Sequence, residues 1–199
     1  MASIQKVGII GAGAMGQGIA QIAAQANLQV YLFDVNEVAV SKAQEQLAAI
    51  WARQVERGRM SQEQVQAAQA QIKACSQLED MAEADLVIEA IVESLAVKQE
   101  VFKQLEALVR SDCILASNTS SLSITAIAQA CAQPERVAGF HFFNPVPLMK
   151  VVEVIEGLRT APTTCEALVE VAQRMGHTPV RAKDMPGFIV NHAGRPMNI

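Results

Sequence analysis

Short runs of β-branched and aliphatic residues alternate along the chain with longer segments whose apolar residues recur every three or four positions. The first apolar run covers residues 6–10 and the second covers 28–33, and the segment between them has helical spacing. Continuous short apolar runs are typical of buried strands, and a 3.6-residue period is typical of an amphipathic helix. The opening therefore predicts a strand, a helix and a parallel strand joined by a right-handed crossover.

Residues 37–74 interrupt this alternation with two predicted helices. Apolar residues line one face of the first helix, Gly58 ends it, and Ser61 with Gln64 forms a capping box for the second. The segment is rich in Gln and Ala, but its periodicity argues against disorder.

Strand and helix alternate again after residue 85. A helix is predicted at about 165–175, and strands are predicted at residues 86–91, 114–116, 137–143, 150–156 and 178–181. This order is typical of an α/β fold with a doubly wound, mostly parallel, Rossmann-like sheet that carries a two-helix excursion after its second strand. We expect residues 1–184 to form this domain, with a boundary at 184–187.

Composition and charge narrow the functional classes. The net charge is −4 and no basic block occurs, which argues against nucleic acid as a partner. The four cysteines include no C-x-x-C pair, so no metal site is expected. No signal peptide, transit peptide or membrane-spanning run is recognisable. We therefore expect a cytoplasmic protein with no membrane partner.

A glycine motif follows the first predicted strand. Gly11, Gly13 and Gly16 match G-x-G-x-x-G, and Asp34 follows 18 residues after the last of them. The glycines allow a tight turn, close approach of a pyrophosphate and packing of the helix on the sheet, and the helix N-terminus then faces the phosphates. Asp34 would accept hydrogen bonds from a ribose 2′-hydroxyl and repel a 2′-phosphate, so NAD is the expected cofactor. The cofactor-binding candidates in this region are Gly11, Gly13, Ala14, Met15, Gly16 and Asp34.

A histidine and a glutamate occupy neighbouring predicted strands. His141 lies late in its strand beside an Asn-Pro-Val-Pro loop, where doubly wound sheets place ligands. Imidazole titrates near neutral pH, which suits a general base. Glu153 lies among valines, where a carboxylate is unfavourable unless it is paired. The alternatives are a buried histidine bonded to backbone and an edge-strand glutamate that points at water.

Several segments resemble the 3-hydroxyacyl-CoA dehydrogenase family, in that family's order and at similar spacing. They are residues 8–18, 89–93, 117–122, 139–147 and 186–191. The segment around His141 is the most specific, and the resemblance extends to about Pro196. Hydroxyisobutyrate-type dehydrogenases share the glycine motif, but they are expected to use a lysine where this chain has His141.

The resemblance implies NAD-dependent oxidation of an L-3-hydroxyacyl-CoA to the 3-oxoacyl-CoA, in fatty-acid or related acyl-CoA catabolism. It assigns His141 and Glu153 as a catalytic dyad, in which Glu153 fixes the imidazole tautomer and His141 takes the proton of the 3-hydroxyl as hydride leaves C3. It also implies that Ser120 and Asn191 hydrogen-bond the 3-oxygen from opposite sides.

Further cofactor and substrate contacts follow from the same resemblance. Glu93 and Lys98 are implied to lie near the nicotinamide ribose and the diphosphate, although both would otherwise be solvated charges at a helix start. Asn118 lies in a polar run that follows a strand, and is a further cofactor-binding candidate. The two-helix excursion is implied to touch the adenine end of CoA, and its basic residues are Lys42, Arg53, Arg57 and Arg59. A solvated helix face is the alternative for each of them.

The end of the chain departs from the family. Its members continue as a helical domain, which the resemblance implies closes the acyl-CoA site and forms a homodimer. We expect residues 185–199 to be the truncated start of that domain, and a family-type homodimer only where the domain is present. A non-catalytic NAD-binding domain or fragment, without a complete acyl-CoA site, remains the alternative function.

Overall fold

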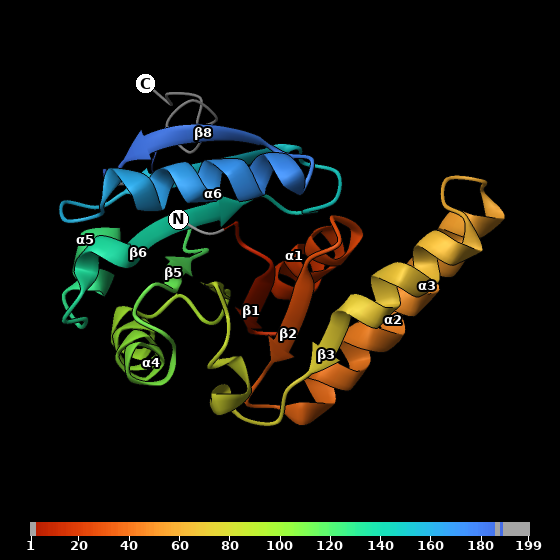
Figure 1. Ribbon diagram of the computed structural model, residues 1–199, viewed down its shortest axis with the longest axis horizontal. Coiled ribbons are helices and arrows are strands. Elements are labelled where there is room, and N and C mark those ends of the chain that lie inside the picture. The colour runs from red at the N-terminus through yellow and green to blue at the C-terminus, as the bar shows by residue number, and fades with distance from the viewer. Residues whose placement is uncertain (1–2, 186–187, 189–199) are drawn as a thin grey trace, which may run out of the picture.

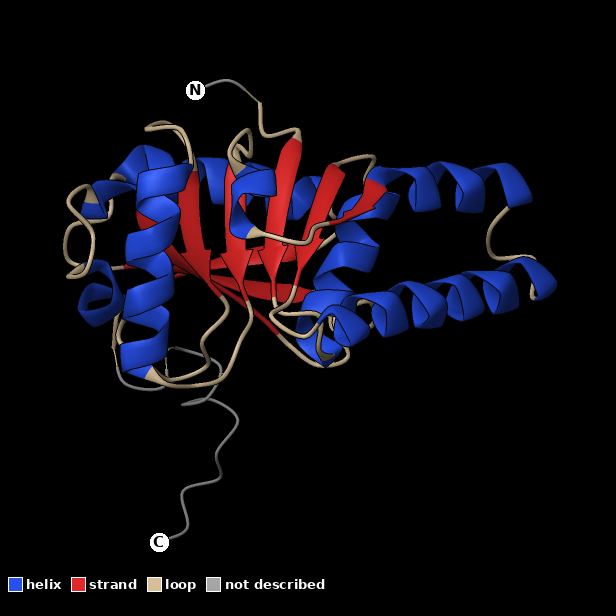
Figure 2. Ribbon diagram, turned by 90° about the horizontal axis from the view of Figure 1, so that it is seen from below, coloured by secondary structure: helices blue, strands red, loops and turns tan. Residues whose placement is uncertain are grey.

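The computed structural model describes residues 3–185 and 188. In this part of the chain, eight strands form one sheet with helices packed against it (Figure 1 and Figure 2). The strands are β1 (Lys6–Ile10), β2 (Gln29–Phe33), β3 (Ile72–Ala74), β4 (Leu86–Glu89), β5 (Ile114–Ser117), β6 (Val137–Phe142), β7 (Val151–Glu156) and β8 (Thr178–Lys183).

The helices follow the strands in near-regular alternation. They are α1 (Ala14–Gln25), α2 (Glu37–Glu56), α3 (Gln62–Gln71), α4 (Leu95–Leu108), α5 (Ile124–Ala128) and α6 (Pro162–Arg174), with short 3₁₀ turns η1 (Leu78–Met81) and η2 (Pro134–Arg136). The capping box of Ser61 and Gln64 is present at the start of α3. The predicted two-helix excursion is present as the α2–α3 hairpin, which extends beyond the end of the sheet (Figure 2).

The sheet has the order β3-β2-β1-β4-β5-β6-β7-β8, and only the β6–β7 pair is antiparallel among the described strands. The strand order reverses between β1 and β4. Ligands of doubly wound sheets bind outside the carboxyl ends of the strands at such a reversal. The turns after β1 and β4 should therefore flank the cofactor, and the predicted fold class is confirmed.

The core lies on both faces of the sheet because parallel strands bury both of their sides. Ile9 and Leu32 pack with residues of α1, α2 and α6 on one face, whereas Ile10 and Phe33 pack with residues of α4 and α5 on the other. Trp51, only 1% exposed, anchors α2 in the first of these clusters.

Several boundaries differ from those predicted. Residues 72–74 form β3 instead of continuing the excursion, a short edge strand without an apolar run to reveal it. Strand β4 ends at Glu89, not at residue 91, because the amide of Ile91 donates to the Glu89 side chain and the chain turns away. Helix α6 begins at Pro162, before the predicted residue 165, since proline suits the first turn of a helix.

Candidate active site

The turn after β1 has the geometry of a dinucleotide cradle. Gly11 has a φ of +100°, which favours glycine, and a Cβ on Gly16 would lie 1.7 Å from the carbonyl oxygen of Gly11. Helix α1 therefore starts in close contact with the turn, as the motif predicts. Gly13 is the N-cap of α1 without a side chain to bond the first amides, and a Cβ there would meet no atom within 4 Å. The helix N-terminus is thus open to a diphosphate.

Asp34 lies beside this cradle at the end of β2. Its Oδ2 accepts a hydrogen bond from the amide of Ala12 at 2.8 Å, and its Oδ1 accepts one from the amide of Asn36 at 2.9 Å. These bonds fix the carboxylate next to the glycine turn, where the ribose of a bound dinucleotide would lie. The residues present therefore fit NAD, and a fixed anion here disfavours a 2′-phosphate.

Two hollows adjoin the cradle and meet at Ala90 and Ile91, in the turn after β4. The larger one, here the cofactor groove, has a volume of about 590 Å³ and is mostly apolar. It is lined by Ile10, Gly11, Gly13, Phe33, Asp34, Val35, Leu78, Ala90, Ile91, Val92, Val97, Val101 and Gln104.

The second one, here the catalytic hollow, measures about 340 Å³ and is lined by Met15, Ala90, Ile91, Glu93, Asn118, Ser120, His141, Phe142, Phe143 and Asn144. Gly13, the N-cap of α1, lines the groove, and Met15 in the first turn of α1 lines the hollow. An extended dinucleotide could thus cross the helix N-terminus from one to the other.

His141 and Glu153 face each other on the antiparallel strands β6 and β7. The Nδ1 of His141 lies 2.8 Å from Oε2 of Glu153, and the two side chains are 7% and 0% exposed. A carboxylate at Nδ1 requires that nitrogen to carry a proton, which leaves Nε2 as the basic nitrogen. Strand β8 covers β7, so the alternative of an edge-strand glutamate that points at water is wrong.

The aromatic neighbours of His141 limit the movement of its ring. Phe143 lies with its ring centroid 4.4 Å away, and Phe188 lies 5.9 Å away. Because Nδ1 bonds Glu153 and not a backbone carbonyl, the alternative of a histidine satisfied by backbone is also wrong.

Asn118 and Ser120 follow β5 and both line the catalytic hollow. Asn118 Oδ1 accepts a hydrogen bond from the amide of Phe142 at 2.9 Å, so this side chain holds the strand end that carries His141. Ser120 is exposed, and its amide donates to Oε1 of Glu93 at 3.0 Å. Asn191, the remaining catalytic candidate, lies outside the described residues.

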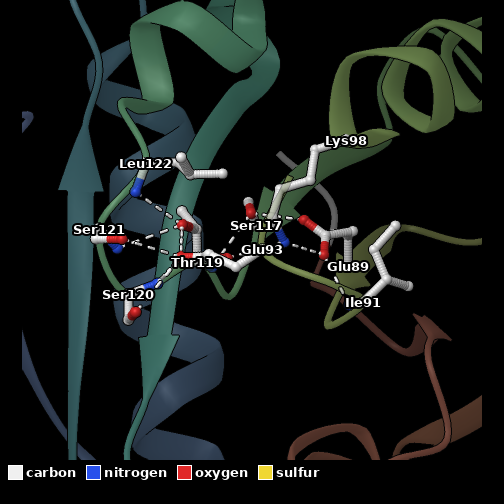
Figure 3. A network of polar contacts seen from close by, with 9 residues as sticks. All are labelled: Glu89, Ile91, Glu93, Lys98, Ser117, Thr119, Ser120, Ser121 and Leu122. Carbon is white, nitrogen blue, oxygen red and sulfur yellow. Dashed lines mark hydrogen bonds and ion pairs between the residues drawn. The ribbon is translucent and has the colours of Figure 1, made fainter. Parts of the chain in front are cut away.

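Glu93 and Lys98 belong to a polar network beside the hollow (Figure 3). Lys98 is 1% exposed, and its Nζ lies 2.5 Å from Oε1 of Glu89 and 3.4 Å from Oε2 of Glu93. The alternative of a solvated charge is therefore wrong for Lys98. Burial opposes ionisation of Glu93, but hydrogen bonds from Thr119 and Ser120 and the Lys98 ammonium hold the pKa of its carboxyl below its usual value.

Sequence reasoning assigned no part to several members of this network, among them Thr119 and the pair Glu89 and Ser117. Glu89 and Ser117 lie deepest. Both are fully buried, and the Ser117 hydroxyl donates to Oε2 of Glu89 at 2.6 Å. The signal that revealed Glu153, a carboxylate within an apolar strand, was equally present at Glu89 in the run Leu86–Glu89.

The basic residues expected at CoA lie exposed on the α2–α3 hairpin: Lys42, Arg53, Arg57 and Arg59. Their contact with CoA stays a prediction.

Within residues 3–185 and 188, no cluster of His, Cys, Asp and Glu could hold a metal ion, and no helix is long and apolar enough to cross a membrane. Cys113 and Cys75 are core residues, and their burial raises the pKa of the two thiols to about 12 and about 11.

Comparison with protein families gives one match to nearly the whole described chain. The family described as "3-hydroxyacyl-CoA dehydrogenase, NAD binding domain" matches residues 6–185. The expectations of NAD as the cofactor and of an NAD-dependent dehydrogenase as the class of enzyme are confirmed by this match.

Individual relatives agree with the family match. A probable 3-hydroxybutyryl-CoA dehydrogenase of Bacillus subtilis is 44% identical over 98% of this chain and 68% of its own length. A 3-hydroxyadipyl-CoA dehydrogenase of Escherichia coli is also 44% identical over 98% of this chain, but this chain spans only 41% of its length.

A crystal structure of (S)-3-hydroxybutyryl-CoA dehydrogenase from Ralstonia eutropha superposes with a TM-score of 0.93 at 40% identity. It covers 96% of this chain, which in turn covers 67% of that protein.

Proposed function

The chain belongs to the 3-hydroxyacyl-CoA dehydrogenase family, whose NAD-binding domain it carries, and from this we propose that it catalyses the NAD-dependent oxidation of an L-3-hydroxyacyl-CoA to the 3-oxoacyl-CoA. The observation that carries the proposal is the buried His141–Glu153 pair, held at 2.8 Å, whose histidine lines the catalytic hollow beside the cofactor groove. Oxidation of an alcohol removes a hydride from the carbon and a proton from its hydroxyl group, and a positioned base next to a dinucleotide cradle suits both removals.

His141 and Ser120, which line the hollow, and Glu153 behind His141 each have a part in this proposed reaction. When bound, NAD supplies the acceptor for the hydride that leaves C3. Nε2 of His141 takes the proton of the 3-hydroxyl, while Glu153 holds Nδ1–H and stabilises the imidazolium that forms. Ser120 donates a hydrogen bond to the 3-oxygen, which steadies the oxygen as it becomes a carbonyl. Asn191 would do the same from the opposite side, as the family resemblance implies.

The wider setting is part of the same proposal. We propose an acyl-CoA substrate, a role in fatty-acid or related acyl-CoA catabolism, and a cytoplasmic location. A relative from Psychrobacter arcticus is named fatty acid oxidation complex subunit alpha and is 40% identical over 94% of this chain, which spans 26% of that protein's length. A homodimer is expected only with the helical domain, and residues 1–184 and 185–199 remain the proposed domain division.

The direct experiment is reduction of acetoacetyl-CoA with NADH, monitored through the loss of NADH absorbance. It is carried out on this chain and on the chain extended by the unmatched C-terminal part of the Bacillus subtilis relative. Turnover that disappears in His141→Gln supports the proposal. Turnover by neither protein, under conditions in which NADH binds to both, would refute it.

A second function is favoured by one observation. The chain spans between 41% and 69% of the lengths of its first curated relatives. The family resemblance implies that the unmatched part closes the acyl-CoA site. A non-catalytic NAD-binding domain would bind NADH, and His141→Gln would not lower this affinity. Neither the chain nor its extended form would turn over an acyl-CoA.

A further inference from the structure

Glu89 is a carboxylate that the proposed reaction does not use, although it lies beside the catalytic hollow. It is fully buried at the end of β4 and receives three donors. Its Oε1 accepts from Nζ of Lys98 at 2.5 Å and from the amide of Ile91 at 2.8 Å, and its Oε2 accepts from the Ser117 hydroxyl at 2.6 Å. A buried anion held in this way is fixed in position, because each lost partner would leave charge or a polar group unpaired.

Two branches start at Glu89. In the first, Lys98 bridges from Glu89 to Oε2 of Glu93, and Oε1 of Glu93 accepts the Thr119 hydroxyl at 2.5 Å. In the second, the Ser117 hydroxyl bonds Glu89 and accepts the amide of Thr119 at 3.2 Å. Both branches reach Thr119, one at its side chain and one at its backbone, so the contacts form a closed ring (Figure 3).

Thr119 in turn shapes the loop that presents Ser120. Its Oγ1 accepts the amide of Leu122 at 2.9 Å and that of Ser121 at 3.3 Å, which closes a turn around Ser120. Glu93 adds a bond from the amide of Ser120 itself at 3.0 Å. The contacts that begin at Glu89, outside the hollow, therefore continue as far as the turn that carries Ser120.

We propose that Glu89 is a positioning residue for Ser120, acting through the ring of Lys98, Glu93, Thr119 and Ser117. The proposal rests on the catalytic role proposed for Ser120. Loss of the Glu89 charge leaves Glu93 as the nearby counterion of Lys98, which pulls Glu93 away from Thr119 and Ser120. It also leaves the Ser117 hydroxyl facing an amide instead of a carboxylate acceptor. Both branches then loosen the turn.

Glu106 offers a matched control on the same helix as Lys98. Its carboxylate is 15% exposed, pairs with the buried Arg136 at 3.5 Å, and accepts the amides of Ala132 and Gln133 at 2.6 and 2.9 Å. Glu106→Gln therefore removes one charge from a buried ion pair, as Glu89→Gln does, but none of these contacts reaches the Ser120 turn.

The test is amide hydrogen exchange by NMR on the full chain, without cofactor or substrate, with global stability measured in parallel by urea unfolding. In Glu89→Gln we expect the Leu122 amide to exchange at least about tenfold faster than the change in global stability accounts for. In Glu106→Gln we expect no excess at Leu122. Equal behaviour of the two variants at Leu122 would overturn the proposal and leave Glu89 a purely stabilising residue.

Ser117→Ala keeps the test decisive if Glu89→Gln does not fold, since it cuts the second branch without removing a charge. The same excess exchange at Leu122 is expected, and its absence would also overturn the proposal. Because no acyl-CoA or NADH is present, a failure of turnover in the activity assay refutes the proposed function alone and leaves this result unaffected.

Discussion

Replacing Glu153 with glutamine tests how the buried carboxylate serves His141. The variant keeps the shape of a fully buried side chain and removes only the charge that faces Nδ1 at 2.8 Å. A hydrogen bond to a charged group contributes about 1.5–3 kcal/mol, more than a neutral hydrogen bond. The carboxylate supplies this stabilisation when His141 becomes an imidazolium. Since about 1.4 kcal/mol corresponds to a factor of ten in rate, turnover should fall by about 10- to 100-fold.

The assay is acetoacetyl-CoA reduction on whichever form of the chain turns over, with NADH affinity measured by fluorescence titration. NADH affinity should stay nearly constant, because the cradle at Gly11, Gly16 and Asp34 is separate from Glu153. The double variant with His141→Gln should be little slower than His141→Gln alone. Losses that multiply independently, or a loss confined to NADH affinity, would refute the idea of a dyad.

Two further predictions concern the cradle and the end of β8. Asp34→Ala should narrow the preference for NADH over NADPH by about tenfold, because one like-charge contact with a 2′-phosphate is removed; equal titration curves for both cofactors on the unchanged protein would contradict this. Asp184 accepts hydrogen bonds from Ser123, Ile124 and Thr125 at the start of α5, and although burial opposes its ionisation, these bonds hold its pKa below the usual value. Asp184→Asn should therefore lower the free energy of unfolding at neutral pH by about 0.5–2 kcal/mol, as measured by urea unfolding. The difference in unfolding free energy between the two proteins should shrink as the pH falls below the ordinary aspartate pKa of about 3.9. A difference that is constant with pH would contradict this prediction.

The fold could be predicted from sequence because its signals are local. The glycine motif, the apolar strands and the period of the long helices each lie within one segment. The boundaries that differed depend on contacts across segments. Strand β3 exists only because it pairs with β2, and β4 stops where Glu89 binds the amide of Ile91.

The contact between His141 and Glu153 was also predictable from sequence. His141 and Glu153 could be paired because an isolated carboxylate among valines needs a partner, and the strand register supplies one. The Glu89 network was not predictable, because Lys98 and Ser117 are distant in sequence from one another and a lysine near a helix start is usually solvated. Only the fold brings Lys98 and Ser117 together around Glu89, although the burial of Glu89 itself could be predicted from its apolar strand.

The measurement that tests the central claim most directly is the rate at which NADH is oxidised in the presence of acetoacetyl-CoA. It is measured on the chain extended by a C-terminal domain, once with His141 present and once with His141→Gln. The account predicts turnover by the unchanged protein, a fall of about 10²- to 10⁴-fold in the variant, and equal NADH affinity for both. A variant that retains full activity would contradict the assignment of His141 as the general base.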